Sequence, residues 1–201
     1  SALSQNQVDI LIGTQMLAKG HNFPNLTLVG IVDADFGLAG GDLRASERTF
    51  QLLQQVAGRA GRYDKKGSAY IQTYSPQNNV IQALQTGDRP LFMQTEISAR
   101  QMLSMPPFGR LAGVIISAKQ ENLAISVAKT LMRHAPSIAG VEFLGPVSAP
   151  IYQLRGKYRY RILVKSAKNI ALQKIIRRWL EPFQFPSAVT VRVDIDPYSF
   201  F

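Results

Sequence analysis

In the first hundred residues, short apolar runs are separated by a segment in which apolar residues recur with helical spacing. The runs predict buried strands over residues 8–13, 26–32 and 68–74. Between the second and third runs, Phe50, Leu53 and Val56 fall on one helical face, which predicts a helix over residues 43–57. Strand and helix therefore alternate over the first part of the chain, as in a parallel α/β sheet.

The later residues show a different pattern. Helices are expected over residues 78–86 and 89–103, and Pro106 and Pro107 close this helical connector. Beyond the prolines, the order strand, helix, strand, strand, helix, strand is expected over residues 111–118, 122–134, 141–146, 157–165, 167–181 and 188–195. This βαββαβ order predicts a ferredoxin-like α+β domain, with two helices on one face of an antiparallel sheet. We therefore expect three parts, residues 1–75, 76–110 and 111–201.

Composition narrows the class of protein. The chain has 201 residues, of which 46% are hydrophobic, which is enough for a packed core. It contains no cysteine, which excludes disulfides and thiolate metal sites within it, and two histidines offer little to any other metal. We expect no metal site here. No basic segment precedes an apolar run at the start, and no run reaches about 20 apolar residues, so we expect a cytoplasmic protein without a membrane partner.

The positive charge is concentrated in the second half. The net charge is +10, with 10 basic and 8 acidic residues up to residue 110, and 13 basic and 5 acidic residues beyond it. Such a surface attracts polyanions, and nucleic acid is the leading partner ahead of an anionic membrane surface. Ordinary solubility charge is the alternative reading.

Two segments carry candidate phosphate-binding groups. Arg59 and Arg62 are three residues apart between glycines, and their guanidinium forks could contact phosphates. They could instead be solvated arginines that end a helix. Upstream, Thr14 and Gln15 follow Gly13, where backbone amides and a hydroxyl can hold a phosphate, although a simple turn would fit equally well.

A basic strand is expected in the second half. Tyr158 and Tyr160 alternate with Arg159, Arg161 and Lys165, which places the arginines and the lysine on the open face of the sheet. With Arg155 and Lys157 at the adjoining loop, this distribution suits phosphate contacts. The tyrosines could stack on bases, but their position on the buried face favours a role in the core.

The order of the motifs resembles superfamily 2 helicases. The segments GTQMLAKGHNFPNLTLVGIVDAD and ERTFQLLQQVAGRAGR look like motifs V and VI of that superfamily. Later features resemble the PriA family of primosomal replication-restart DNA helicases: Pro106-Pro107-Phe108, Leu144-Gly145-Pro146, residues 155–160 and residues 194–197. The resemblance implies that residues 1–75 are part of a RecA-like helicase lobe 2 and that residues 111–201 form a C-terminal domain that binds DNA and partners.

The resemblance also implies roles for individual residues. Arg59 and Arg62 would act on the transferring phosphate of ATP. The other implied nucleotide contacts are Gln55, Gly58 and Asn22, and the implied contacts to DNA near motif V are Thr14, Gln15 and Lys19. Many members of the superfamily carry Asp where Asn22 stands, so this position departs from the common pattern.

Parts of a complete motor are missing from the sequence. There is no GxxxxGK[ST] phosphate loop and no acidic motif for Mg²⁺, so we expect the chain alone to be inactive and to be the C-terminal part of a longer protein. By resemblance, ATP and Mg²⁺ would bind mainly to an absent lobe 1, and zinc only to an absent cysteine-rich insert.

The resemblance implies an ATP-dependent 3′ to 5′ DNA helicase that restarts replication at stalled forks, in the bacterial cytoplasm and associated with the nucleoid. Its implied partners are branched and single-stranded DNA, other primosome proteins and single-stranded DNA-binding protein, whose acidic tail could contact Lys168, Gln173 and Arg177. A non-enzymatic nucleic-acid-binding or partner-docking module is the alternative, and an RNA-binding ferredoxin fold is a third possibility.

Overall fold

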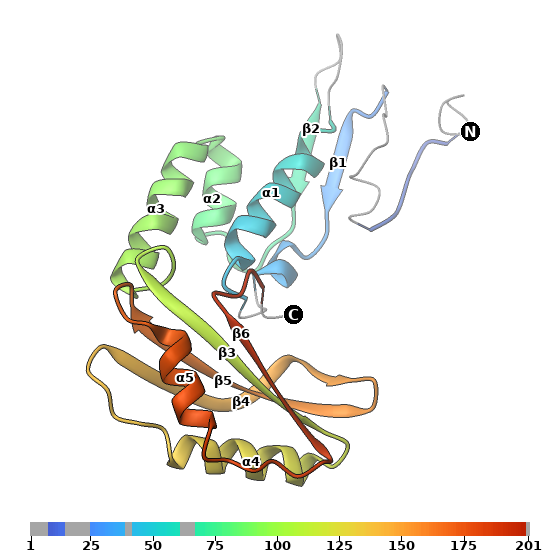
Figure 1. Cartoon of the computed structure of the whole chain (residues 1–201). Coiled ribbons are helices and arrows are strands. Elements are labelled where there is room, and N and C mark those ends of the chain that lie inside the picture. The colour runs from blue at the N-terminus through green and yellow to red at the C-terminus, as the bar shows by residue number, and fades with distance from the viewer. Residues whose placement is uncertain (1–7, 15–24, 39–41, 61–66, 200–201) are drawn as a thin grey trace. The chain divides into compact units, whose positions relative to one another are not determined.

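The computed structural model describes residues 8–14, 25–38, 42–60 and 67–199. The chain divides into two compact units, Ser1–Thr95 and Glu96–Phe201. Helix α3 (Arg89–Met102) runs from the first unit into the second. Each unit is described separately, and its elements can be followed in Figure 1.

The first unit contains a parallel pair of strands, as the sequence predicted. Strand β1 (Leu28–Ile31) pairs with β2 (Ser68–Ile71), with Leu28 opposite Ser68 and Ile31 opposite Ile71. The helix α1 (Ala45–Ala57) lies between the two strands in sequence and begins two residues later than expected. A short 3₁₀ helix (Ala34–Gly37) follows β1.

The strand predicted over residues 8–13 is not present. Residues 8–14 form neither helix nor strand and are exposed, Ile12 to 90%. The prediction was wrong because an apolar run becomes a strand only where another strand accepts its backbone hydrogen bonds. In the described part of the first unit the only ladder is the one between β1 and β2.

Two helices complete the core of the first unit. The helix α2 (Asn79–Thr86) begins at Asn78, whose side chain accepts a hydrogen bond from the Val80 amide at 2.9 Å, and this cap fixes its first turn. Phe50 of α1 and Phe92 of α3 stack with ring centroids 4.3 Å apart, beside the buried Val80. The predicted helices over 78–86 and 89–103 are therefore confirmed.

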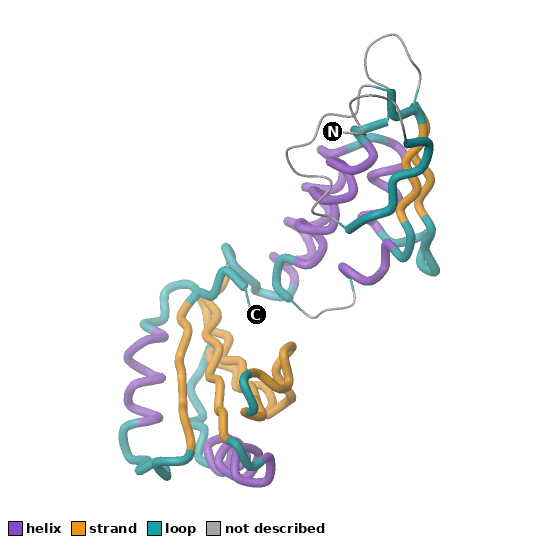
Figure 2. The backbone as a smooth tube through the Cα atoms, turned by 90° about the vertical axis from the view of Figure 1, so that its right-hand side faces the viewer, coloured by secondary structure: helices purple, strands orange, loops and turns teal. Residues whose placement is uncertain are grey.

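The second unit is built in the predicted βαββαβ order. Its elements are β3 (Gly109–Ala118), α4 (Glu121–Arg133), β4 (Val141–Leu154), β5 (Lys157–Ala167), α5 (Leu172–Leu180) and β6 (Val189–Ile195). The strands form one antiparallel sheet in the order β4-β5-β3-β6, which is the ferredoxin-like arrangement. The helices α4 and α5 pack into one core with the same face of this sheet, and the backbone of the unit can be followed in Figure 2. The opposite face, which carries neither of these helices, is called the open face.

Two boundaries differ from the prediction. Strand β4 continues to Leu154 rather than ending near residue 146, so it forms a long hairpin with β5 through two register shifts. Helix α5 begins at Leu172 rather than residue 167, because Ala167 still pairs with Gly109 in the ladder between β3 and β5. As a result, Lys168 lies in the turn before the helix.

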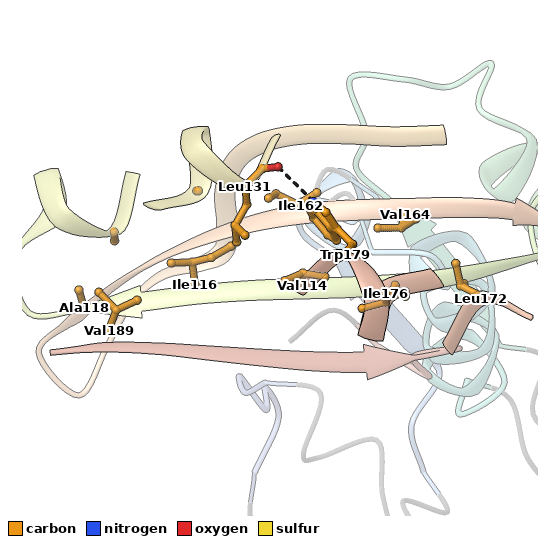
Figure 3. Close-up of a cluster of buried hydrophobic side chains, with 13 residues drawn as sticks. Val114, Ile116, Ala118, Leu131, Ile162, Val164, Leu172, Ile176, Trp179 and Val189 are labelled. Atoms are coloured by element: carbon orange, nitrogen blue, oxygen red, sulfur yellow. Dashed lines mark hydrogen bonds between the residues drawn. The ribbon is translucent and has the colours of Figure 1, made fainter. Parts of the chain in front are cut away.

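Trp179 of α5 packs in the core of the second unit. Its indole Nε1 donates a hydrogen bond to the Leu131 carbonyl oxygen at 3.2 Å, and its ring meets Phe143 edge-on at 4.8 Å. Ile116 and Ile162 are fully buried beneath the helices (Figure 3). Burying side chains of this size stabilises a fold by about 1.5–3 kcal/mol each.

Candidate nucleic-acid interface

The alternation along β5 separates a buried face from a basic face. Ile162 and Val164 are 0% exposed beneath the helices, and Tyr160 packs against the same core. Since neighbouring residues of a strand point to opposite faces, Arg159 and Arg161 lie on the open face of the sheet. Both side chains are half-buried: Arg159 Nη1 donates to the Ile151 carbonyl oxygen at 3.2 Å, and Nε and Nη1 of Arg161 are buried.

The tip of the hairpin between β4 and β5 is a two-residue turn. Arg155 has a φ of 51° and Gly156 a φ of 71°, so both residues adopt the left-handed conformation of a type I′ turn. Glycine takes this conformation without strain, whereas an arginine there is uncommon. The Arg155 side chain is exposed at the tip.

The two lysines of β5 differ in what they contact. The Lys157 ammonium donates to the Thr190 hydroxyl at 3.4 Å and so reaches across β3 to β6 on the open face. The Lys165 ammonium forms an ion pair with the Glu142 carboxylate at 2.7 Å. Lys165, one of the predicted phosphate contacts, is therefore neutralised by its neighbour on β4.

Sequence reasoning missed one residue of this surface. Ile115 of β3 pairs with Arg161 on one side and with Arg192 of β6 on the other. Residues that are directly opposite in a sheet share a face, so Arg192 lies on the same open face as Arg161. The sequence already contained this signal. Val189 and Val191 alternate along the strand and indicate its buried face, so Arg192 is expected on the open face.

The tyrosines face the helix side and contact one another. The Tyr160 hydroxyl donates to the Glu121 carboxylate at 2.7 Å, and the Tyr152 ring meets Tyr158 and Tyr160 edge-on at 5.5 and 6.0 Å. Hydrogen bonds from Tyr152 and Tyr160 lower the pKa of Glu121, and the hydrogen bond to Glu121 raises the pKa of Tyr152. These partners favour a structural role over stacking on bases.

The glycine and arginine motif follows the C-terminal end of α1. The Gly58 amide donates to the Gln54 carbonyl at 2.9 Å, and the Arg59 amide donates to the Val56 carbonyl at 3.1 Å. A Cβ at Gly58 would lie 3.1 Å from the Gln54 oxygen, so this tight turn favours glycine. Gln55 is exposed in the last turn of the helix, and Arg59 is half-buried directly after it.

The remaining predicted nucleotide and DNA contacts are only partly visible. Thr14 is exposed. Four predicted site residues lie outside the described part of the chain: Gln15, Lys19, Asn22 and Arg62.

The predicted partner-binding residues are spread from the turn before α5 to its last turn. Lys168, Gln173 and Arg177 are exposed. The Gln173 side-chain oxygen accepts a hydrogen bond from Arg110 at 3.1 Å, and Arg110 is ion-paired with Asp196 at 2.6 Å. The Gln173 side chain is thus held by Arg110, while Lys168 lies in the turn before α5 and Arg177 in its last turn.

Within residues 8–14, 25–38, 42–60 and 67–199, no group of three or more His, Cys, Asp or Glu side chains could hold a metal ion. In the same ranges, no helix is both long and apolar enough to cross a bilayer.

Comparisons with known domain families match both parts of the chain. Residues 1–64 match the Helicase conserved C-terminal domain, and residues 101–198 match the Primosomal protein N C-terminal domain. The α/β first unit and the ferredoxin-like second unit agree with these two domains. The chain is therefore of the helicase-related class that the motifs resembled.

Three relatives identify the family more closely. The chain is 49% identical to Replication restart protein PriA of Rickettsia felis, over 97% of its own length and 30% of the relative. It is 38% identical to the protein of that name from Bacillus subtilis, over 98% of the chain and 25% of the relative. For Haemophilus influenzae the identity is 37%, over 97% and 27%. The chain belongs to the PriA family, in which it corresponds to the C-terminal part, and it spans about a third or less of these relatives.

Proposed function

We propose that the chain is the C-terminal part of an ATP-dependent 3′ to 5′ DNA helicase that restarts replication at stalled forks. The observation that carries this proposal is the match over 97% of the chain to a relative named as a replication restart protein. The helicase C-terminal domain and the basic sheet face support it. The comparisons do not favour an unrelated nucleic-acid-binding module.

In this proposal the first unit contributes to the nucleotide site. Arg59 and Arg62 donate hydrogen bonds to phosphate oxygens and stabilise the charge that builds up during phosphoryl transfer. Gln55, Gly58 and Asn22 line the same site. ATP, with Mg²⁺ held mainly by the rest of the protein, supplies the free energy for movement along DNA.

DNA contacts come from both units. In the first unit we assign them to Thr14, Gln15 and Lys19. In the second unit we assign them to Arg155 at the hairpin tip and to Lys157, Arg159 and Arg161 of β5. Lys165 is left out because it is paired with Glu142.

Protein partners are assigned to the α5 end of the second unit. Lys168 and Arg177 provide exposed positive charge, and the tethered Gln173 provides a hydrogen-bonding amide. This chemistry suits carboxylates, and we propose the acidic tail of single-stranded DNA-binding protein as the ligand. The other proteins of the primosome are further proposed partners.

The test uses the full-length protein that contains this chain. Arg59→Ala and Arg62→Ala should each reduce DNA-stimulated ATP turnover at least about 100-fold, since arginines in this role contribute on the order of 10³-fold or more. DNA affinity should stay nearly unchanged. The control is Arg89→Ala, which removes an exposed arginine at the start of α3. Full ATPase activity in Arg62→Ala would overturn the assignment.

A further inference from the structure

The open face of the second sheet is divided into two halves of different charge. Toward the hairpin tip it carries Lys157, Arg159, Arg161 and Arg192. Toward the other end it carries Asp194 and the pair formed by Lys165 and Glu142. The tip half therefore carries four basic residues, whereas the other half carries one basic residue and two acidic ones.

We propose that nucleic acid binds to the tip half alone, and that Arg192 is a phosphate contact of this surface. This inference rests on the DNA-binding role proposed above. It adds one contact residue and states where on the sheet the DNA-binding surface ends. It assigns Arg192, which lies about 36 residues beyond the hairpin turn, and it excludes Lys165, which lies on the basic strand itself.

The register of the sheet places Arg161 and Arg192 at the same level, on either side of β3. The two residues occupy the strands on either side of β3, with Ile115 between them. Adjacent strands are about 4.8 Å apart, so the two backbone positions are separated by about 10 Å. Arg192 is exposed on one side of Ile115, and the half-buried Arg161, whose Nε and Nη1 are buried, adds positive charge on the other, so a phosphate chain that crosses the strands can be held at Arg192.

The next set of register partners toward the hairpin tip is arranged in the same way, with a β3 residue between residues of β5 and β6. Ser117 of β3 lies between Arg159 and Thr190, and it is only 8% exposed. A small buried residue at the centre leaves room for the long cations of β5. Arg159 donates to the Ile151 carbonyl oxygen at 3.2 Å, and Lys157 extends to the Thr190 hydroxyl at 3.4 Å. The two sets together present four positive charges and one hydroxyl from two strands.

The chemistry of the surface indicates the kind of binding. Its floor is formed by Ile115 and Ser117, and the tyrosines of β5 lie on the opposite face. Arginine and lysine without an aromatic platform contact phosphates rather than bases. The surface should therefore bind single-stranded and forked DNA without strong dependence on sequence.

The experiment measures anisotropy of labelled single-stranded and forked DNA, titrated with this 201-residue chain over a series of salt concentrations. Arg192→Ala should weaken binding severalfold at low salt. It should also reduce the slope of log affinity against log salt by about 0.7 on single strands and about 0.9 on duplex, as expected for one lost phosphate contact. Arg192→Lys should restore most of the slope.

Two matched variants separate a local contact from net charge. Lys174→Ala removes one exposed charge from α5 on the helix side, and the double variant Lys165→Ala/Glu142→Gln removes the ion pair from the other half of the open face without changing its net charge. Both should stay within about twofold of the wild type. Equal losses in all three alanine variants would overturn the proposal, as would an unchanged slope in Arg192→Ala whose thermal unfolding matches the wild type.

Other outcomes are also decisive. If the chain binds polyglutamate or anionic vesicles through Arg192 but not DNA, the surface is not a nucleic-acid site and the proposal fails. If the Arg192 result holds while full-length Arg62→Ala keeps its ATPase activity, the interface stands and the proposed motor function falls.

Discussion

The Lys165 ammonium and the Glu142 carboxylate lie 2.7 Å apart on register partners of β5 and β4. Both side chains remain partly exposed to solvent, so the pair contributes little to stability, at most about 1 kcal/mol. Its larger effect is on the surface potential, since it cancels a cation at the edge of a basic face. Glu142 thereby limits how far that face extends.

Removal of Glu142 should extend the basic face. We expect Glu142→Gln to raise the affinity for single-stranded DNA severalfold at low salt, because it frees the Lys165 ammonium and removes one negative charge. The gain should vanish as salt increases. Anisotropy titrations would measure it, with Glu181→Gln as the control that removes an exposed carboxylate next to α5. The same gain in both variants would point to net charge instead.

Trp179 should dominate the stability of the second unit. Trp179→Ala should lower the free energy of unfolding by about 3–5 kcal/mol, because it leaves a cavity between α4, α5 and the sheet. Trp179→Phe should cost less, since it keeps most of the volume and loses the hydrogen bond to the Leu131 carbonyl. Urea unfolding followed by circular dichroism would measure the free energy of unfolding of both variants. Equal losses in the two variants would contradict the role of side-chain volume.

The hairpin turn should accept asparagine but reject valine. At a φ of 51°, Arg155→Val should lower the free energy of unfolding by about 1–2 kcal/mol, because a β-branched side chain clashes in the left-handed region. Arg155→Asn removes the same charge, but asparagine tolerates this conformation, so stability should hold. Thermal unfolding of the two variants is the comparison, and similar losses in both would exclude strain as the cause.

Glu121 should make stability depend on pH in the acid range. Its pKa lies below the ordinary 4.5 because Tyr152 and Tyr160 donate to the carboxylate, so the folded state binds this proton less readily than the unfolded state. The stabilisation is therefore complete well above pH 4.5 and is lost as pH falls through the lowered pKa.

The variant Glu121→Gln tests this effect. Its melting temperature should fall below that of the wild type at pH 7, and the gap should narrow at pH 3, where the wild-type carboxyl is increasingly protonated. A gap of constant size across this range would show that the tyrosines act on Glu121 through packing alone.

The chain by itself should not hydrolyse ATP, with or without DNA. It lacks the phosphate loop and the acidic motif that hold the phosphates and Mg²⁺. A coupled assay of phosphate release should give the same background for the wild type and for Arg59→Ala. Turnover above background that depends on Arg59 would contradict this expectation.

The spacing of apolar residues and the order of the expected elements were sufficient to predict the topology of the second unit. The alternation around Ile162 and Val164 set the two faces of β5, and the βαββαβ order set the topology. The ends of elements were harder, since a ladder contact decides whether Ala167 belongs to a strand or a helix. Tertiary pairing outweighed local pattern there.

The candidate site was predictable only in part, for two physical reasons. Lys165 was assigned to the basic face correctly, but its neutralisation depends on the register that brings Glu142 opposite it. Arg192 could have been found from alternation, yet it lies in a strand whose local sequence is not basic. Only the strand order shows that Arg192 lies across β3 from Arg161.

The position of β3 in the sheet has a mechanical consequence. The chain passes from α3 into β3, which pairs with β5 along its whole length and with β6 along most of it. A pull transmitted along α3 would therefore reach the sheet at a strand that is paired on both sides, not at an edge strand. The force would thus have to break two ladders, rather than one, before β3 left the sheet.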